Sequence, residues 1–252
     1  MKWLRVLVRG ATASILTGGM WSLWLLVHLL LSYVPRAQRR WRRKIFRSWG
    51  RSLCRVLGVQ VEVVGQPSAE PGVLVCNHLT YIDIPVLAGY LDTVFVAKSE
   101  IASWPAIGFL SRHMGTIFID RGRNRSIPDV NRQIDAALAA GDGVVIFPEG
   151  TSTSGAAVAP FRASLLEPAA EARRPVHVAS ISYRTAEGMR PPSEVVCWWG
   201  DMEFGPHLLE FLGLKRVYGR LEFGSTSVVE SDRKLLAEKL WRAVDQLFIP
   251  MA

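Results

Sequence analysis

The chain of 252 residues is long enough for one sizeable α/β domain with a membrane anchor and too short for two full domains. Apolar residues make up 49% of it and its mean hydropathy is +0.18, so part of its apolar surface is expected to face lipid. The net charge of +8 belongs to the amino-terminal arm, because residues 1–58 hold 12 Lys or Arg and no acid whereas the remainder is net acidic. This placement argues against a nucleic-acid partner, whose basic face would normally lie on the folded domain.

An apolar run of 24 residues without a formal charge, Ala11–Val34, follows two arginines and precedes eight cations between positions 36 and 51. A membrane-spanning helix needs about 20 such residues. A secretory signal peptide fits poorly, because the apolar core is too long and no small-residue cleavage site precedes the cations. Two interpretations stay open. The run is a single span that leaves the domain on the cytoplasmic side of the inner membrane, or two helices bent near Gly18-Gly19 that enter one leaflet.

The next stretch, residues 41–57, carries apolar side chains at spacings of three and four among the cations, which is typical of an amphipathic helix. We expect this helix to lie on an anionic membrane surface. The alternative is a helix that packs on the domain with a solvated basic face. Residues 1–57 are therefore interpreted as the membrane anchor and basic amphipathic helix, and residues 58–252 as one α/β domain.

Beyond residue 58, short apolar runs alternate with helical patterns, which predicts an α/β fold with a mostly parallel central sheet flanked by helices. The predicted strands are Val59–Val64, Gly72–Cys76, Val94–Ala97, Thr116–Ile119, Gly143–Phe147, Val176–Ser182, Val195–Trp198 and Arg220–Phe223. The predicted helices are Ile82–Tyr90, Glu100–His113, Pro128–Ala140, Leu165–Ala172, Pro206–Phe211 and Asp232–Leu247. The three cysteines have no metal-ligand spacing, so free buried thiols are expected at Cys54, Cys76 and Cys197.

One strand end combines a histidine with a carboxylate. The apolar run Val73–Cys76 leads into Asn77 and His78, and Asp83 follows in the first turn of the next predicted helix. If the loop folds back, the Asp83 carboxylate can hold one imidazole nitrogen and leave the other free as a base. A hydroxyl nucleophile needs such a base at neutral pH. Alone the pair is a weak signal, since a buried histidine beside a helix-capping aspartate is commoner.

Two further strand ends carry charged residues. Asp120-Arg121 follows one predicted strand, and Phe147-Pro148-Glu149-Gly150-Thr151 ends another. Taken singly, these are an ordinary surface ion pair and a turn acid. In open α/β sheets, however, functional residues gather where parallel strands end. The three strand ends therefore form one candidate site.

Together the blocks N-H-x-x-x-x-D at 77–83, G-x-I-F-I-D-R at 115–121 and F-P-E-G-T at 147–151 resemble, in order, those of the glycerolipid acyltransferase family. This family is of the 1-acylglycerol-3-phosphate acyltransferase type and includes lysophospholipid and lyso-ornithine lipid acyltransferases. The resemblance spans about residues 55–185. It implies an O-acyltransferase of phospholipid synthesis that moves a fatty acyl chain from acyl-CoA or acyl carrier protein onto a lysolipid hydroxyl, with no metal and no bound cofactor.

The resemblance also implies residue roles. His78 would deprotonate the acceptor hydroxyl, and Asp83 would orient and stabilise the imidazolium. Arg121 would bind an anionic headgroup such as a phosphate, for which a guanidinium is suited. The acceptor site would be shaped by the third block, Glu149, Gly150 and Thr151.

The chain departs from the family pattern in two places. Many members that use lysophosphatidate have Arg after F-P-E-G-T, where this chain has Ser152. The later P-F-K-x-G stretch keeps a cation here, Arg162, but loses its glycine. The acceptor is therefore open between lysophosphatidate and a lyso-aminolipid, such as lyso-ornithine lipid, or another lysophospholipid. An inactive membrane-binding scaffold is the alternative of a different class. The aromatic and acidic stretch 197–205 is interpreted either as a pocket lining or as edge-strand packing.

Overall fold

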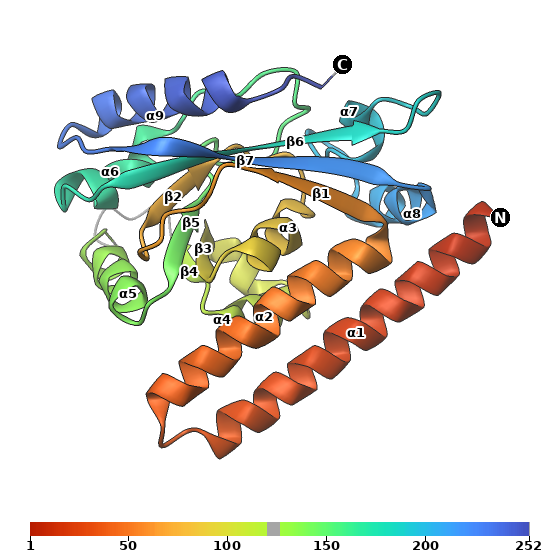
Figure 1. The fold of residues 1–252 in the computed structure, drawn as a ribbon, viewed down its shortest axis with the longest axis horizontal. Coiled ribbons are helices and arrows are strands. Elements are labelled where there is room, and N and C mark those ends of the chain that lie inside the picture. The colour runs from red at the N-terminus through yellow and green to blue at the C-terminus, as the bar shows by residue number, and fades with distance from the viewer. Residues whose placement is uncertain (120–126, 252) are drawn as a thin grey trace.

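The computed structural model of this protein describes residues 1–119 and 127–251, and these contain seven strands in one sheet. In chain order the strands are β1 Val59–Val64, β2 Val73–Cys76, β3 Thr93–Lys98, β4 Ile117–Ile119, β5 Gly143–Ile146, β6 Val176–Thr185 and β7 Val217–Val228. Their order across the sheet is β1-β7-β6-β2-β5-β3-β4 (Figure 1). Only the β6–β7 pair among these strands is antiparallel. The predicted α/β fold with a mostly parallel sheet is confirmed.

Helices cover both faces of the sheet. The helices that follow β2 are α3 Asp83–Tyr90, the 3₁₀ helix η1 Ser99–Ser103, α4 Ile107–Met114, α5 Ile127–Ala139, α6 Ala163–Glu171, α7 Pro192–Val195, α8 Phe204–Gly213 and α9 Arg233–Leu247. Helix α9 lies over β6 and β7 beside α6, and α3 lies on the opposite face (Figure 1). The central strand β2 is buried along its whole length, as expected for a parallel strand covered on both sides.

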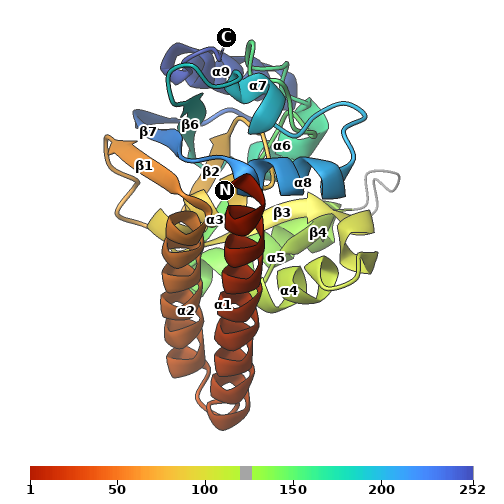
Figure 2. The ribbon, with the colours of Figure 1, turned by 90° about the vertical axis from the view of Figure 1, so that its right-hand side faces the viewer.

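The amino-terminal arm is an antiparallel pair of helices, α1 Lys2–Leu30 and α2 Pro35–Leu57. Pro35 occupies the first turn of α2, where its missing N–H is not needed, and Gly58 ends α2 in the left-handed conformation. Helix α1 runs without interruption through Gly18 and Gly19, so the bend predicted there as one of two interpretations is wrong. The chain reverses at residues 31–34 instead. Figure 2 shows both helices extending together away from the sheet.

The start of α1 and the end of α2 are both attached to the globular part. At the start of α1, Arg5 donates to the Gly213 carbonyl at 2.6 Å and Arg9 donates to the Lys215 carbonyl at 3.0 Å. These carbonyls belong to the carboxyl end of α8 and the residues just after it, which carry the negative end of the helix dipole. The amino end of α1 and the end of α2 therefore lie on the same side of the pair, against the domain.

The basic face of α2 is divided between the domain and solvent. Arg43 donates to the Gly141 carbonyl at 2.5 Å, Arg47 pairs with Asp92 at 3.0 Å, and Arg42 pairs with the buried Asp142. The expectation that the whole basic stretch faces a membrane is wrong for these residues. Three other cations of α2, Arg36, Arg40 and Lys44, are exposed. The predicted boundary at residues 57 and 58 falls at the end of α2, and the division into a membrane anchor and an α/β domain stays a prediction.

Helix α1 presents most of its apolar side chains to the outside. By length and composition it is able to cross a membrane. Its inner side buries only Val6, Trp21 and Trp24. At least half of the surface is exposed on Trp3, Leu4, Leu7, Val8, Ile15, Leu26, Leu29 and Leu30. Such an apolar surface is larger than a soluble protein leaves in water, and it fits contact with lipid.

Two predicted elements differ from the structure. The strand at Val195–Trp198 is wrong: Pro192 opens the short helix α7, and the N–H of Cys197 donates to the Pro192 carbonyl in a turn. The helix at Glu100–His113 is divided into η1 and α4, because Pro105 follows Trp104 and cannot continue a helix. The other predicted strands and helices are present with ends shifted by up to five residues.

Candidate active site

The candidate site lies where β2 and β5 end at the same edge of the sheet. β2 continues into Asn77, whose side chain is fully buried. Its amide donates to the Ile181 carbonyl on β6 at 2.9 Å, and its oxygen accepts from the Ile181 N–H at 2.8 Å. Asn77 thus joins the chain beyond β2 to the neighbouring strand with two hydrogen bonds, and this fixes where His78 emerges.

His78 and Asp83 form the predicted pair. Nδ1 of His78 lies 2.8 Å from Oδ2 of Asp83, and the same oxygen accepts from the N–H groups of Leu79 and Thr80 at 2.7 and 3.0 Å. The Asp83 side chain is fully buried, whereas the His78 side chain is 22% exposed. The carboxylate therefore holds both the imidazole and the loop that carries it, and Nε2 has no hydrogen-bond partner within the described part of the chain.

The other carboxylate oxygen of Asp83 accepts a hydrogen bond from a residue that the sequence analysis missed. The Tyr183 hydroxyl on β6 lies 2.7 Å from Oδ1 of Asp83. Tyr183 is itself buried. The signal that could have found it is its place at the end of a predicted strand, where the parallel neighbour β2 leads to His78.

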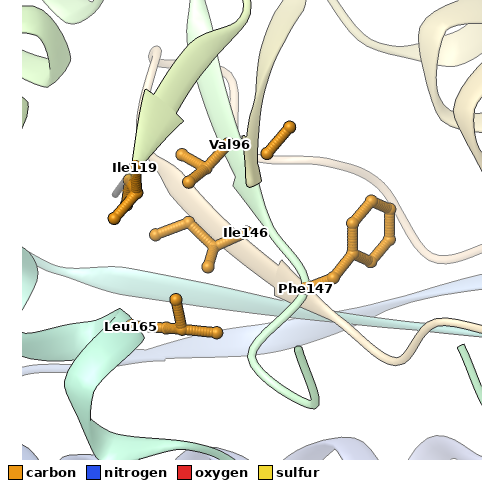
Figure 3. Close-up of a pocket in the computed structure, with 6 residues that line it drawn as sticks. Val96, Ile119, Ile146, Phe147 and Leu165 are labelled. Atoms are coloured by element: carbon orange, nitrogen blue, oxygen red, sulfur yellow. The ribbon is translucent and has the colours of Figure 1, made fainter. Parts of the chain in front are cut away.

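One face of the His78 ring is covered by Phe147. The two rings are stacked, with centroids 4.2 Å apart and an interplanar angle of 21°. Phe147 also lines a small apolar pocket at the ends of β3, β4 and β5, together with Val96, Ile119, Ile146 and Leu165 (Figure 3). Stacking leaves the edge of the imidazole that carries Nε2 as the accessible part of the ring.

Glu149 is buried and binds backbone groups instead of facing solvent. Its Oε1 accepts from the His78 N–H at 2.5 Å, and its Oε2 accepts from the Ala159 N–H at 3.0 Å. Burial raises the pKa of Glu149 to about 7. The next residue, Gly150, has a φ of +77°, which favours glycine. Glu149 therefore positions the His78 backbone and the loop of residues 147–159.

The remaining predicted residues lie around this loop. Thr151 is exposed, and the Ser152 hydroxyl donates to the Trp198 carbonyl. Arg162 has an exposed side chain, and its backbone N–H donates to the Pro148 carbonyl at 2.8 Å. The other predicted cationic residue, Arg121, lies outside the described residues together with Asp120. The structure thus brings His78, Asp83, Glu149 and Ser152 together and places Thr151 and Arg162 on the adjoining surface.

The aromatic stretch after α7 packs directly against the His78 loop. The Trp198 N–H donates to the Leu79 carbonyl at 2.9 Å, and its indole donates to the Met202 carbonyl at 2.7 Å. The ring of Tyr81 from the His78 loop has edge contacts with Trp198 and Phe204. This stretch is therefore a support for the loop, and the edge strand expected there is absent.

No group of three or more His, Cys, Asp or Glu within the described residues is placed to hold a metal ion. Cys54, Cys76 and Cys197 are free and buried, as predicted.

Comparison with known proteins gives a consistent result. A family model described as acyltransferase matches residues 60–184, which contain all the sequence blocks of the site. A lyso-ornithine lipid O-acyltransferase of Rhizobium meliloti (strain 1021) is 34% identical over 258 residues, covering 98% of this chain and 85% of that protein. The chain belongs to the acyltransferase family. The predicted resemblance to glycerolipid acyltransferases is confirmed, as is the prediction of an O-acyltransferase enzyme.

Other similar proteins are named for 1-acyl-sn-glycerol-3-phosphate instead of lyso-ornithine lipid. A 1-acyl-sn-glycerol-3-phosphate acyltransferase of Neisseria meningitidis serogroup B is 31% identical to this acyltransferase over 202 residues, which cover 77% of each chain. The crystal structure of the 1-acyl-sn-glycerophosphate acyltransferase PlsC from Thermotoga maritima has a TM-score of 0.65 and 21% identity, and the match covers 98% of both chains. At that identity the crystal structure supports the fold alone.

Proposed function

We propose that this acyltransferase is membrane-bound and transfers a fatty acyl chain onto a lysolipid hydroxyl, with His78 as the general base. The observation that carries the proposal is the pairing of His78 Nδ1 with the buried Asp83 carboxylate, which leaves Nε2 at the exposed edge of the ring. A histidine held in this way has a fixed tautomer with a free basic nitrogen.

The reaction follows from this geometry. Nε2 accepts the proton of the acceptor hydroxyl while its oxygen attacks the carbonyl carbon of an acyl thioester. The carbon–sulfur bond then breaks, and the thiolate leaves with the proton from the imidazolium. Asp83 stabilises the imidazolium between these two steps. The acyl donor is acyl-CoA or acyl carrier protein, and no bound metal or cofactor takes part.

For the acceptor we favour lyso-ornithine lipid over lysophosphatidate. The relative that matches 98% of this chain is named for lyso-ornithine lipid, whereas the Neisseria relative named for 1-acyl-sn-glycerol-3-phosphate matches 77%. In addition, Ser152 stands where many lysophosphatidate users have Arg, and its hydroxyl is engaged with the Trp198 carbonyl. A serine hydroxyl cannot neutralise a phosphate dianion.

The helical pair suggests how the enzyme meets its substrates. We propose that α1 and α2 lie together along the cytoplasmic face of one leaflet, so that the cations of α2 stay at headgroup depth. The start of α1 and the end of α2 lie against the domain, and spanning would force the cations of α2 through the hydrocarbon. The apolar face of α1 then contacts acyl chains, and the exposed cations Arg36, Arg40 and Lys44 contact anionic headgroups.

The test is acyl transfer by the purified full-length chain in vesicles. Lyso-ornithine lipid, lysophosphatidate and a zwitterionic lysophospholipid are each supplied with acyl-CoA or acyl carrier protein, and kcat/KM is measured. The highest value is expected for lyso-ornithine lipid. Transfer to lysophosphatidate alone would overturn the acceptor assignment, and transfer to none of the three would overturn the proposed function.

A further inference from the structure

The Asp83 carboxylate carries more hydrogen bonds than the pairing with His78 requires. Oδ2 accepts from His78 and from two backbone N–H groups, whereas Oδ1 accepts from the Tyr183 hydroxyl at 2.7 Å. A fully buried carboxylate needs hydrogen-bond donors in place of its water shell. Among the described residues, Tyr183 is the one donor to Oδ1, and so it also determines which way the carboxylate plane is turned.

Tyr183 is held from behind by the carboxyl-terminal segment. Its N–H points at the sulfur of Met251, 3.1 Å away, and the adjacent Ser182 hydroxyl accepts from the Ile249 N–H at 3.2 Å. The Met251 N–H in turn donates to the Gly155 carbonyl at 2.9 Å. Gly155 belongs to the loop after β5, so this segment connects the strand of Tyr183 with the loop of Glu149.

We propose that Tyr183 is a positioning residue for acyl transfer, which fixes the Asp83 carboxylate so that its second oxygen faces His78 Nδ1. The inference rests on the proposed role of His78 and goes beyond it, because Tyr183 lies outside the three sequence blocks of the family. Burial and the nearby Asp83 carboxylate raise the pKa of Tyr183, so its hydroxyl remains a protonated donor. Tyr183 is buried and its hydroxyl binds Asp83, so it acts on His78 through that carboxylate.

The substitution Tyr183→Phe removes this donor and keeps the ring that fills the core. A hydrogen bond to a charged group is strong enough that its loss should lower kcat roughly tenfold or more. The KM values for lysolipid and acyl donor should change less than twofold, because Tyr183 acts through Asp83. Tyr218→Phe is the matched control: Tyr218 lies on the neighbouring strand β7, its ring is 5.1 Å from the Arg184 guanidinium, and its variant should retain the wild-type kcat.

Two measurements separate positioning from a general loss of structure. In the Asp83→Asn background, Tyr183→Phe should lower the residual rate less than twofold, since the charged acceptor is already gone. In the single variant Tyr183→Phe, backbone hydrogen exchange should be faster than in wild type at Leu79 and Thr80, whose N–H groups donate to Asp83, and unchanged in α9. An unchanged kcat in Tyr183→Phe, or wild-type exchange at Leu79 and Thr80, would overturn the inference.

His78→Ala, assayed in parallel, keeps this result distinct from the proposed function. If His78→Ala remains active, the general-base assignment fails, whatever Tyr183→Phe does. If His78→Ala is inactive and Tyr183→Phe has the wild-type kcat, the general base stands and only the role of Tyr183 fails.

Discussion

The hydroxyl of Tyr81 and Nδ1 of His207 lie 3.1 Å apart, which joins the loop after His78 to helix α8. His207 is buried, and burial lowers its pKa, so the ring is neutral near pH 7. The carboxyl end of α8 binds the side chains of Arg5 and Arg9 from α1. The helix proposed to enter the membrane is therefore connected to the catalytic loop through one short helix.

The connection predicts that His207 affects catalysis. His207→Leu removes the partner of Tyr81 and should lower kcat several-fold, whereas His207→Asn keeps an acceptor near Nδ1 and should restore most of it. Tyr81→Phe combined with His207→Leu should lose no more activity than the more damaging single change, because both remove the same bond. Steady-state kinetics of the two His207 variants, of Tyr81→Phe and of the double variant test this, and fully additive losses would contradict it.

The general-base assignment predicts a large loss in His78→Ala. Removing a general base typically costs 10²–10⁴-fold in rate. Asp83→Asn should also lose most activity, because the imidazole tautomer is no longer fixed. Both proteins should still bind vesicles. His113→Ala, in α4, is the matched control and should keep wild-type activity. Near-normal transfer by His78→Ala would remove the central claim.

The exposed cations of α2 should contribute to membrane binding, whereas those bound to the domain should contribute to folding. Arg36→Ala, Arg40→Ala and Lys44→Ala together should weaken binding to anionic vesicles by roughly 100-fold, at about 1 kcal/mol for each cation. The remaining electrostatic binding should fall as salt is added. Arg42→Ala should instead lower the unfolding temperature, because it removes the nearer of the two arginines that pair with the buried Asp142. Co-sedimentation measures vesicle binding, and thermal unfolding measures stability. If Arg42→Ala lost as much vesicle affinity as the triple variant, this division between membrane-binding and domain-binding cations would be contradicted.

Position 152 should influence acceptor choice. Ser152→Arg introduces a cation at the place where many lysophosphatidate users have one, and it should raise the kcat/KM for lysophosphatidate relative to lyso-ornithine lipid tenfold or more. Thr151→Arg, at the exposed neighbouring residue, controls for a general effect of added charge. If the acceptor ratio is unchanged in Ser152→Arg, or shifts equally in both variants, position 152 does not recognise the headgroup.

Glu149 should make the stability of the enzyme depend on pH. Folding raises the pKa of Glu149 from 4.5 to about 7, so its stabilising contribution is complete below pH 4.5 and is lost as pH rises through 7. Glu149→Gln abolishes the titration and places an amide donor against the Ala159 N–H, so it should be less stable than wild type at pH 5. The difference in unfolding free energy should then shrink between pH 5 and 8. A constant difference over that range would contradict the raised pKa of Glu149.

The sequence by itself determined the elements and chemistry that depend on neighbouring residues. Apolar runs ending in polar blocks located the strands and placed His78 and Asp83 five residues apart, within one loop and one helix turn. The blocks also indicated the family. Local patterns determine these features because strand and helix periodicities, proline and glycine act over a few residues.

Only the tertiary structure decided which residues from distant segments meet. Tyr183 and Asp83 are 100 residues apart, as are Arg42 and Asp142, and no local pattern in either segment indicates its partner. Glu149 was expected to shape the acceptor site, yet it accepts hydrogen bonds from the backbone at His78 and Ala159. Such contacts depend on which strands are neighbours and in what register they pair. The burial of apolar surface along the whole sheet selects that arrangement, so no single sequence motif predicts it.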